Sequence, residues 1–459
     1  MDVNEHRTDH GHTDGSTHGH AHGAALEGGW VIWREHPVMR VVLAAVAGCA
    51  VLTLAGLAML WPDGRGQEAV SAEAAAIGLA SDRYGAVVDS VVDANCSYQG
   101  TGAEQVCRTV TVTVTEGPDR GAIVVLPEFN LSQPGVGGQA RVGDELIVGF
   151  EPTTDFYFFA DRDRRPLLTW LSLAFVIVVV VLGRMRGAMA LVSMAMSVVV
   201  LVGFVAPAVL DGNDPLMVCL VAASLIAFAS LYLTHGVSPT TTVALAGTLG
   251  ALVFTLAISS IAFAFARFSG LASDEAITLP IVAGDIDLVG LLLGGAMIGA
   301  LGALDDVTVT QVATVAELRR QRPDLSVRQL TAAGVRVGRE HIASTVNTLL
   351  LAYAGAAMPL LLLFAISDQS IGMIANSEVV AIEIVRTLCG SMGLVAATPL
   401  TTVLAAIVVA GREVSPGPGP DLPTGMDAPA ETRPAPQAEV LPADEARWED
   451  FAPRDDAGF

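Results

Sequence analysis

The chain of 459 residues contains no lysine and few charged residues of any kind. Charged side chains make up 16% of the sequence, whereas 52% of the residues are hydrophobic. This composition, with several apolar runs of about 18 residues or more, excludes a soluble globular protein and indicates one that crosses a membrane repeatedly. Because lysine is missing, the orientation of the spans has to be inferred from arginine.

Recognisable catalytic motifs are missing as well. The sequence has no GxSxG, HExxH or P-loop pattern, which would indicate hydrolase, metalloprotease or nucleotide chemistry. Gly302-Ala-Leu-Asp305 is faintly similar to a segment of intramembrane aspartyl proteases, but that chemistry needs a second catalytic aspartate in another span, and none is well placed. We therefore do not expect an enzyme, and the sequence does not identify a cofactor.

Eight apolar segments are predicted to cross the membrane. The fold that we expect is an α-helical polytopic membrane protein with about eight transmembrane helices. The first apolar run is too long, and too far from Val70-Ser71-Ala72, to be a cleaved signal peptide, so we interpret it as an anchor. The predicted spans are approximately 39–61, 167–183, 188–210, 215–234, 240–266, 288–305, 342–366 and 380–410.

Arginines cluster beside these segments. If all eight spans are correct, every cluster falls on one side of the membrane, and the positive-inside tendency makes that side, with both termini, cytoplasmic. The largest cluster, in the loop before the seventh span, is expected to contact anionic lipid head groups, and no nucleic-acid partner is implied. The clusters are Arg34 and Arg40, Arg184 and Arg186, the loop arginines Arg319, Arg320, Arg322, Arg328, Arg336 and Arg339, and finally Arg412.

The segment 62–166, between the first two spans, is predicted to be an extracytoplasmic linker followed by a β-domain. Short β-branched runs begin at Tyr84, Arg108, Gly121 and Asp144, and glycine-containing turns separate them. Short alternating strands need closure to protect their edges, so we expect a small all-β domain of about five strands, an OB-like barrel.

Two of the five cysteines, Cys96 and Cys107, flank a polar loop in this β-rich segment. On the oxidising side of the membrane such a pair is expected to form a disulfide, the alternative being two unpaired thiols. Cys49, Cys219 and Cys389 lie in apolar spans and are interpreted as small hydrophobic residues.

Two polar tails flank the predicted membrane part. Residues 1–38 form a His-rich tail and residues 412–459 an acidic, Pro-rich tail, and both are expected to be disordered and cytoplasmic. Alternating histidines can bind Zn²⁺ or Ni²⁺ weakly, and the alternative is a low-complexity tail without a metal. The candidate metal ligands are His10, His12, His18, His20 and His22.

Three ordered blocks combine polar residues with apolar runs. They are Gly302-Ala-Leu-Asp305-Asp306-Val-Thr308-Val-Thr310-Gln311, then Gly338-Arg339-Glu340-His341 continuing to Tyr353-Ala-Gly355, and Glu383-Ile-Val-Arg386 continuing to Thr398-Pro399-Leu-Thr401. With these blocks the chain resembles the YibE/F-like family of bacterial multi-pass membrane proteins over roughly residues 80–411. The resemblance implies a bacterial plasma-membrane protein but no particular reaction or substrate.

Asp305 and Asp306 lie at the boundary of the sixth predicted span, where a carboxylate is costly unless it faces protein, water or a cation. The β-branched residues 307–310 predict a break in the helix, and Thr308 and Gln311 have the spacing of a capping box that would start a new one. Either the acids pair with Arg336, Arg339 or His341, or they handle a cation or a proton.

Further polar residues lie in the last two predicted spans. Ser344, Asn347 and Thr348 share one helix face and are expected either to pack against other helices or to line a pathway. Glu383 and Arg386 have the spacing of an ion pair, which would serve as an interfacial anchor or bound a route across the bilayer. With Asp305, Asp306, Thr308, Thr310 and Gln311, these five residues form the candidate polar site.

These patterns favour a permease-like membrane protein for ions or small solutes, with residues 39–61 as an anchor and residues 167–411 as a seven-helix membrane domain. Polar residues in three different spans support this interpretation. The alternative is a non-transporting envelope scaffold whose β-domain binds a protein or cell-wall component. Besides the lipid bilayer, the sequence leaves open a second copy of the chain or an envelope protein as partner.

Overall fold

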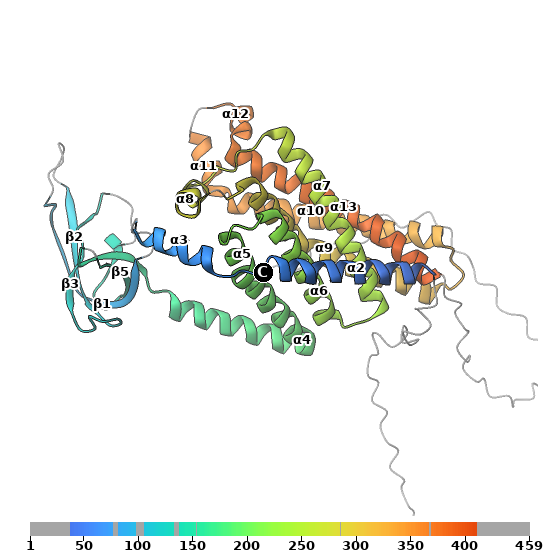
Figure 1. Ribbon diagram of the computed structural model, residues 1–459, viewed down its shortest axis with the longest axis horizontal. Helices are drawn as coiled ribbons and strands as arrows, with labels where there is room; N and C mark the ends of the chain where they lie inside the picture. Colours follow the sequence, from blue (N-terminus) through green and yellow to red (C-terminus); the bar gives the residue numbers. More distant parts are fainter. Residues whose placement is uncertain are drawn as a thin grey trace, which may run out of the picture. The chain divides into compact units, whose positions relative to one another are not determined.

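A computed structural model of the chain describes residues 37–76, 81–97, 105–132, 137–152, 154–284, 286–366 and 369–410 (Figure 1). It contains a helical bundle and a β-sheet, which are treated separately below. The candidate metal ligands of the amino-terminal tail and the whole acidic tail lie outside the described residues.

The helical part begins with α2 and ends with α13. Helix starts follow local capping: Asp214 accepts from Met217 N–H, Ser238 from Thr241 N–H, and Ser326 forms a capping box with Gln329. The helices are α2 (Pro37–Met59), α3 (Arg65–Ala76), α4 (Arg165–Val200), η3 (Leu201–Val205), α5 (Ala206–Leu210), α6 (Pro215–His235), α7 (Pro239–Ala266), α8 (Asp274–Ala283), α9 (Leu288–Gln321), α10 (Val327–Ala356), α11 (Met358–Ile366), α12 (Ile371–Asn376) and α13 (Glu378–Ala410).

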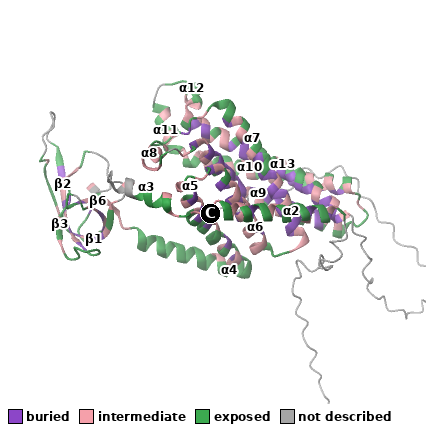
Figure 2. Ribbon diagram, in the orientation of Figure 1, coloured by how far each residue is buried: buried purple, intermediate pink, exposed green. Residues whose placement is uncertain are grey.

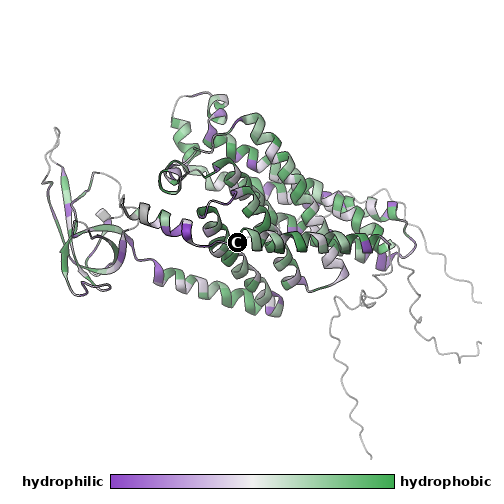
Figure 3. Ribbon diagram, in the orientation of Figure 1, coloured by the Kyte–Doolittle hydropathy of each residue, from purple (hydrophilic) through white to green (hydrophobic). Residues whose placement is uncertain are grey.

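Six helical stretches in the described residues are long and apolar enough to cross a membrane. They are α2, the continuous stretch Arg165–Leu210, α6, α7, α9 and α13. Figure 3 shows hydrophobic residues along most of their length. Helices α10 and α11, which are bent by 62° at the break between them, would add a seventh span if the pair is counted as one. The structure thus supports a multi-pass architecture with six or seven candidate spans.

The stretch Arg165–Leu210 covers the second and third predicted spans. Its 46 residues would form a helix about 69 Å long, more than twice the thickness of the hydrocarbon core. The backbone leaves the helical conformation at Arg184, where φ is 51° and ψ is −134°. A Cβ atom on Gly187 would overlap the carbonyl oxygen of Val179, eight residues earlier, which is possible only if the chain folds back between them. The break therefore lies at the predicted Arg184–Arg186 turn.

The centre of the bundle is built by α7, α9 and α13, where buried residues concentrate (Figure 2). Glycines and threonines allow these helices to approach closely: a Cβ on Gly247 would overlap Thr401 Oγ1, and a Cβ on Gly393 would overlap Thr255 Oγ1. The hydroxyls of Thr248 and Thr308 are 2.7 Å apart across the α7–α9 contact. Threonine hydroxyls thus lie within an otherwise apolar interface, which is closed by packing.

Adding a single methyl group to this interface should destabilise the bundle. In Gly393→Ala the new Cβ meets Thr255 Oγ1, so α7 and α13 must separate, and overpacking of this kind typically costs about 1–3 kcal/mol. The measurement is the thermal unfolding midpoint of the purified protein in detergent. Gly295→Ala is the matched control, because a Cβ there has no neighbour within 4 Å; equal midpoints for the two variants would contradict the close packing.

The β-sheet has six antiparallel strands in the order β3-β2-β1-β5-β6, with β4 paired to β2. Alternate residues of β2 point into its core, as the Val-Thr alternation predicts. The core includes Val88, Val112 and Tyr157. The Tyr157 hydroxyl donates to the Asp119 carboxylate. Burial and this carboxylate raise the pKa of Tyr157 to about 12. The strands are β1 (Asp82–Asn95), β2 (Val106–Val114), β3 (Ile123–Val125), β4 (Phe129–Asn130), β5 (Glu145–Glu151) and β6 (Phe156–Arg162).

The sequence-based strand assignment is confirmed for β1, β2, β3 and β5, and the predicted turns at Gly117, Gly121 and Gly143 have positive φ. The two-residue β4 and the aromatic β6 were not predicted. The expected small β-domain is thus confirmed as an antiparallel sheet. In the described residues β3 and β6 are the two edge strands and do not pair with each other, so closure of the sheet into an OB-like barrel stays a prediction.

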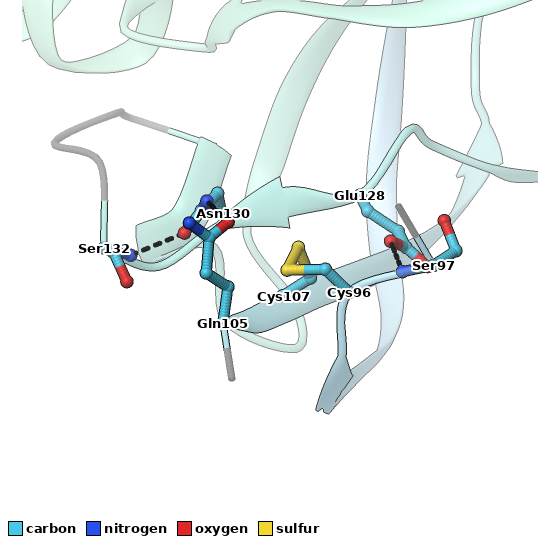
Figure 4. Close-up of a disulfide and its surroundings, with 7 residues drawn as sticks. All are labelled: Cys96, Ser97, Gln105, Cys107, Glu128, Asn130 and Ser132. Atoms are coloured by element: carbon cyan, nitrogen blue, oxygen red, sulfur yellow. Dashed lines mark hydrogen bonds between the residues drawn. A yellow bond between two sulfur atoms is a disulfide. The ribbon is translucent and has the colours of Figure 1, made fainter. Parts of the chain in front are cut away.

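The predicted disulfide between Cys96 and Cys107 is present (Figure 4). Their Cα atoms are 4.8 Å apart, where the ladder between β1 and β2 ends. Beside the bridge, Ser97 N–H donates to Glu128 at 2.8 Å, and the side chain of Asn130 donates to Gln105 at 2.7 Å. Cys219 and Cys389 are buried without a disulfide partner, as expected for small apolar residues.

Candidate functional site

Helix α9 runs without interruption through Asp305 and Asp306, so the predicted helix break is wrong. Thr308 does not cap a new helix; its hydroxyl donates to the Asp305 carbonyl within the same helix at 3.1 Å. Buried Leu304, Val307 and Val312 pack into the bundle core and outweigh the modest helix propensity of the β-branched run. A break does occur elsewhere, at Ala357 between α10 and α11.

Because α9 continues to Gln321, Asp305 lies near its middle, about 25 Å from either end. The end of the helix that was predicted at Asp305 is therefore also wrong, whereas the position of the acids at the edge of the membrane stays a prediction. Thr248, nine residues after the start of α7, and Ser230, five residues before the end of α6, place their hydroxyls beside the Asp305 carboxyl. The carboxylate is thus surrounded by three helices of the bundle.

One oxygen of Asp305, Oδ1, is buried and has no hydrogen-bond partner. No charged side chain in the described residues is paired with this carboxyl. A buried, unpartnered carboxylate oxygen is costly, because neither water nor a hydrogen-bond donor compensates its lost hydration. Sequence reasoning selected Asp305 but missed Ser230 and Thr248, which are two of several hydroxyl residues in α6 and α7 and are not distinguished from the others by the sequence.

Asp305 borders a cleft of about 360 Å³ between α4, α6 and α9. We call it the Asp305 cleft. Its polar lining consists of Asp305 and four hydroxyl residues, Ser193, Ser197, Ser230 and Thr234. Gly302 also lines it and keeps its wall open, since a Cβ at that position would meet no atom within 4 Å. Apolar side chains complete the cleft, so it combines one carboxylate with hydroxyl oxygens.

The neighbouring Asp306 has different surroundings. Its side chain is 74% exposed, and one oxygen lies 3.8 Å from Nε2 of His341 on α10, an ion pair when the histidine is protonated. Among the described residues, His341 is thus the partner of Asp306, and neither Arg336 nor Arg339 pairs with it. The two adjacent acids therefore differ, because a histidine faces Asp306, whereas no arginine or histidine in the described residues pairs with Asp305.

A second cleft, of about 330 Å³, lies between α9 and α10. We call it the Gln311 cleft, because Gln311, Thr310 and Thr314 line it from α9. His341 and Ser344 line it from α10. Gln311 accepts from the Thr402 hydroxyl of α13 at 3.3 Å, and a Cβ on Gly338 would overlap its side-chain amide.

The polar residues of α10 do not make the interhelical contacts considered for them. Ser344, Asn347 and Thr348 are exposed, and the Thr348 hydroxyl donates at 3.0 Å to the Ser344 carbonyl of its own helix. Of these three residues, Ser344 lines the Gln311 cleft. The predicted Glu383–Arg386 pair is present on α13 at 2.8 Å, half-buried.

The chemistry available at the Asp305 cleft is the binding of a cation or a proton by oxygen. In the described part of the chain, no three histidine, cysteine or acidic side chains gather closely enough to hold a metal ion. Asp305 is the single ionisable group that lines the cleft.

Comparison with known proteins agrees with the architecture. A sequence model described as "YibE/F-like protein" matches residues 171–411, more than half of the 459-residue chain. The match begins after the β-sheet, whereas the resemblance in the sequence extends to about residue 80. No curated protein and no solved structure matches the chain. The match covers the helices that form both clefts and all ten residues of the candidate polar site, and the chain therefore belongs to the YibE/F-like family.

Proposed function

We propose that the chain is a permease-like membrane protein that moves an ion or small solute along α9. The observation that carries this proposal is Asp305, a carboxylate inside a membrane helix with one buried, unpartnered oxygen beside a hydroxyl-lined cleft. Ionisable residues within membrane helices are expensive and mark substrate or ion pathways in many membrane proteins. A purely structural acid would be expected to have a cationic or hydrogen-bonding partner at each oxygen.

In this proposal the route passes both clefts, which border α9 on different sides: the Asp305 cleft lies against α4 and α6, and the Gln311 cleft lies against α10. Their α9 residues extend from Ile298 to Thr314, about 24 Å along the helix, against about 30 Å for the hydrocarbon core. Asp305 and Asp306 lie where one cleft gives way to the other along α9. The interface of α7, α9 and α13 is closed by glycine-threonine packing, so the route follows the open faces of α9.

The topology of the proposal has eight spans. Dividing Arg165–Leu210 at Arg184 and counting α10 with α11 as one span raises the six candidate spans to eight. The arginine clusters then share one side, which makes that side and both termini cytoplasmic, in the plasma membrane of a bacterium. The β-sheet lies between the first and second spans, hence outside the cytoplasm, where its disulfide would be stable.

Flux in proteoliposomes tests the proposal. The full chain is reconstituted, and uptake of monovalent cations, divalent cations, protons and small neutral solutes is compared with liposomes that lack protein. Protein-dependent uptake of at least one of them supports a permease. Absence of protein-dependent uptake across the whole panel would overturn the proposal.

An envelope scaffold is the second candidate, and the edge of the β-sheet favours it. Among the described strands β3 pairs only with β2, and its Ile123 and Val125 are 72% and 61% exposed. An exposed apolar edge strand can accept a strand from a partner protein. The order β3-β2-β1-β5 is that of a Greek key, as in the OB-like barrels that serve as binding modules.

We further propose that Arg336 and Arg339 bind anionic lipid head groups. These exposed guanidiniums have no ion-pair partner in the described residues. The apolar half of α10 begins at Ile342, about 5 Å along the helix from Arg339 and about 9 Å from Arg336. Arg320 and Arg322 are engaged instead by Glu317 and by Asp324, the latter with its pKa lowered to about 2 by Arg322.

Removing the two unpaired arginines should weaken phosphatidylglycerol binding. Each arginine near a membrane surface contributes about 1 kcal/mol, so R336Q/R339Q is expected to lower the affinity about thirtyfold. Native mass spectrometry of the detergent-solubilised protein measures retention of phosphatidylglycerol, phosphatidylcholine and inorganic phosphate. The charge-matched R320Q/R322Q should bind like the wild type. An equal loss in both double variants would show that net charge alone is responsible.

A further inference from the structure

The groups around Asp305 that can face a ligand are all oxygens. Oδ1 of Asp305 is buried and unpartnered, and the hydroxyls of Ser230 and Thr248 stand beside the carboxyl. Thr308, fully buried on the next turn of α9, bonds Thr248 at 2.7 Å and so holds the Thr248 hydroxyl in place. Three helices, α6, α7 and α9, thus bring hard oxygen donors to one point at the wall of the Asp305 cleft.

The charge at this point is a single negative one without a counter-charge. Asp306 faces His341, and both Asp306 and Arg186 act electrostatically on His235 at the end of α6. In the described part of the chain, no arginine or histidine pairs with the Asp305 carboxyl. A carboxylate inside the bundle needs such a partner, because removing one partner of a buried pair is strongly destabilising. The compensating positive charge, a proton or a bound cation, therefore has to come from outside the protein.

The donor set identifies the class of cation. Zn²⁺ and other transition metals prefer histidine and cysteine ligands, and no such cluster occurs in the described residues. Ca²⁺ and Mg²⁺ are typically bound with several oxygen ligands and more than one negative charge, which a lone carboxylate does not supply. One carboxylate with neutral hydroxyls balances one positive charge and suits a small hard ion.

We infer that Asp305 is the anionic ligand of a monovalent cation of the sodium type, bound with the hydroxyls of Ser230 and Thr248. The cation enters from the Asp305 cleft and neutralises the carboxylate, and Oδ1 becomes one of its ligands. The inference rests on the proposed function for the movement of the cation, but the binding itself requires no flux.

Cation-dependent thermal unfolding of the full chain in detergent tests the inference. NaCl, LiCl, KCl, MgCl₂ or CaCl₂ replaces choline chloride at constant pH and ionic strength. Sodium should raise the wild-type unfolding midpoint saturably, by about 5 °C, because a ligand that binds only the folded state stabilises it. Asp305→Asn should abolish this rise. Ser230→Ala and Thr248→Val, which keep the carboxyl, should shift the sodium dependence to at least about tenfold higher concentration.

Matched controls separate ligand loss from general damage. Asp274→Asn removes an exposed carboxylate on α8, and Thr255→Val removes a buried hydroxyl of α7 seven residues from Thr248. Both should respond to sodium like the wild type. Equal midpoints in sodium and choline, a response to divalent cations alone, or an unchanged sodium response in all three site variants would overturn the inference.

The two proposals can fail separately. A sodium-dependent midpoint that requires Asp305, combined with no flux in proteoliposomes, would retain the cation site and remove the transport proposal. Protein-dependent flux combined with no sodium effect on the midpoint would retain the transport proposal and remove the cation site.

Discussion

Replacing Asp305 by asparagine should reduce flux through reconstituted protein to the level of liposomes without protein. Asparagine has nearly the same shape and can still bond the hydroxyls of Ser230 and Thr248, so the fold should persist. The substitution removes the negative charge. Asp305 lies in the middle of α9 and is the one ionisable residue that lines the Asp305 cleft. The measurement is initial uptake of the solute to which the wild type is most permeable.

The control for this experiment is Asp274→Asn. It changes the net charge by the same amount, but its carboxylate is exposed on α8, away from both clefts. Its flux should equal that of the wild type. If Asp305→Asn transports as fast as this control, the carboxylate has no part in the pathway, and the acid is structural.

Opening the Cys96–Cys107 disulfide should destabilise the β-sheet by about 3 kcal/mol. The bridge joins residues 11 positions apart, and a closed loop of that size removes chain entropy from the unfolded state to about this extent. It also ends the ladder between β1 and β2, so its loss should release the tip of that hairpin first. Limited proteolysis of the full chain, with and without reductant, measures the effect.

The double variant C96A/C107A distinguishes the disulfide from other actions of the reductant. It should be cleaved as rapidly as the reduced wild type and show no further change when reductant is added. A wild type whose cleavage rate is unaffected by reductant would contradict a stabilising role for the bridge.

Local sequence patterns predicted much of this fold. The Thr-Val alternation of β2 fixes which residues face the sheet core, because side chains alternate along a strand. Long apolar runs located the helices, and Arg184 marked the point where the chain folds back. The Cys96–Cys107 bridge followed from two cysteines flanking one short loop. In each case the determining signal lies within a few residues of the feature.

The candidate site depends on contacts between distant segments, and there prediction was weaker. The β-branched run after Asp306 indicated a break, but burial of Val307 and Val312 holds α9 together. The break at Ala357, beside Pro359, was not foreseen. Ser230 and Thr248 could not be assigned to Asp305, since nothing local relates α6, α7 and α9. The sequence therefore identified Asp305, whereas its neighbours Ser230 and Thr248 are brought to it by the packing of the helices.

An ion can reach Asp305 only if the Asp305 cleft is open to water, and cysteine accessibility in intact membranes tests this most directly. Gly302→Cys places a thiol on the cleft wall, where a side chain has room. Ala251→Cys is the buried control, fully enclosed in α7, and Val178→Cys is the lipid-facing control, 54% exposed on α4. The background carries alanine at Cys49, Cys219 and Cys389 and keeps the disulfide.

We expect a charged, water-soluble thiol reagent to label Gly302→Cys and to leave both control positions unlabelled. Labelling of Gly302→Cys no greater than that of Val178→Cys would mean that lipid fills the cleft, which would contradict the account.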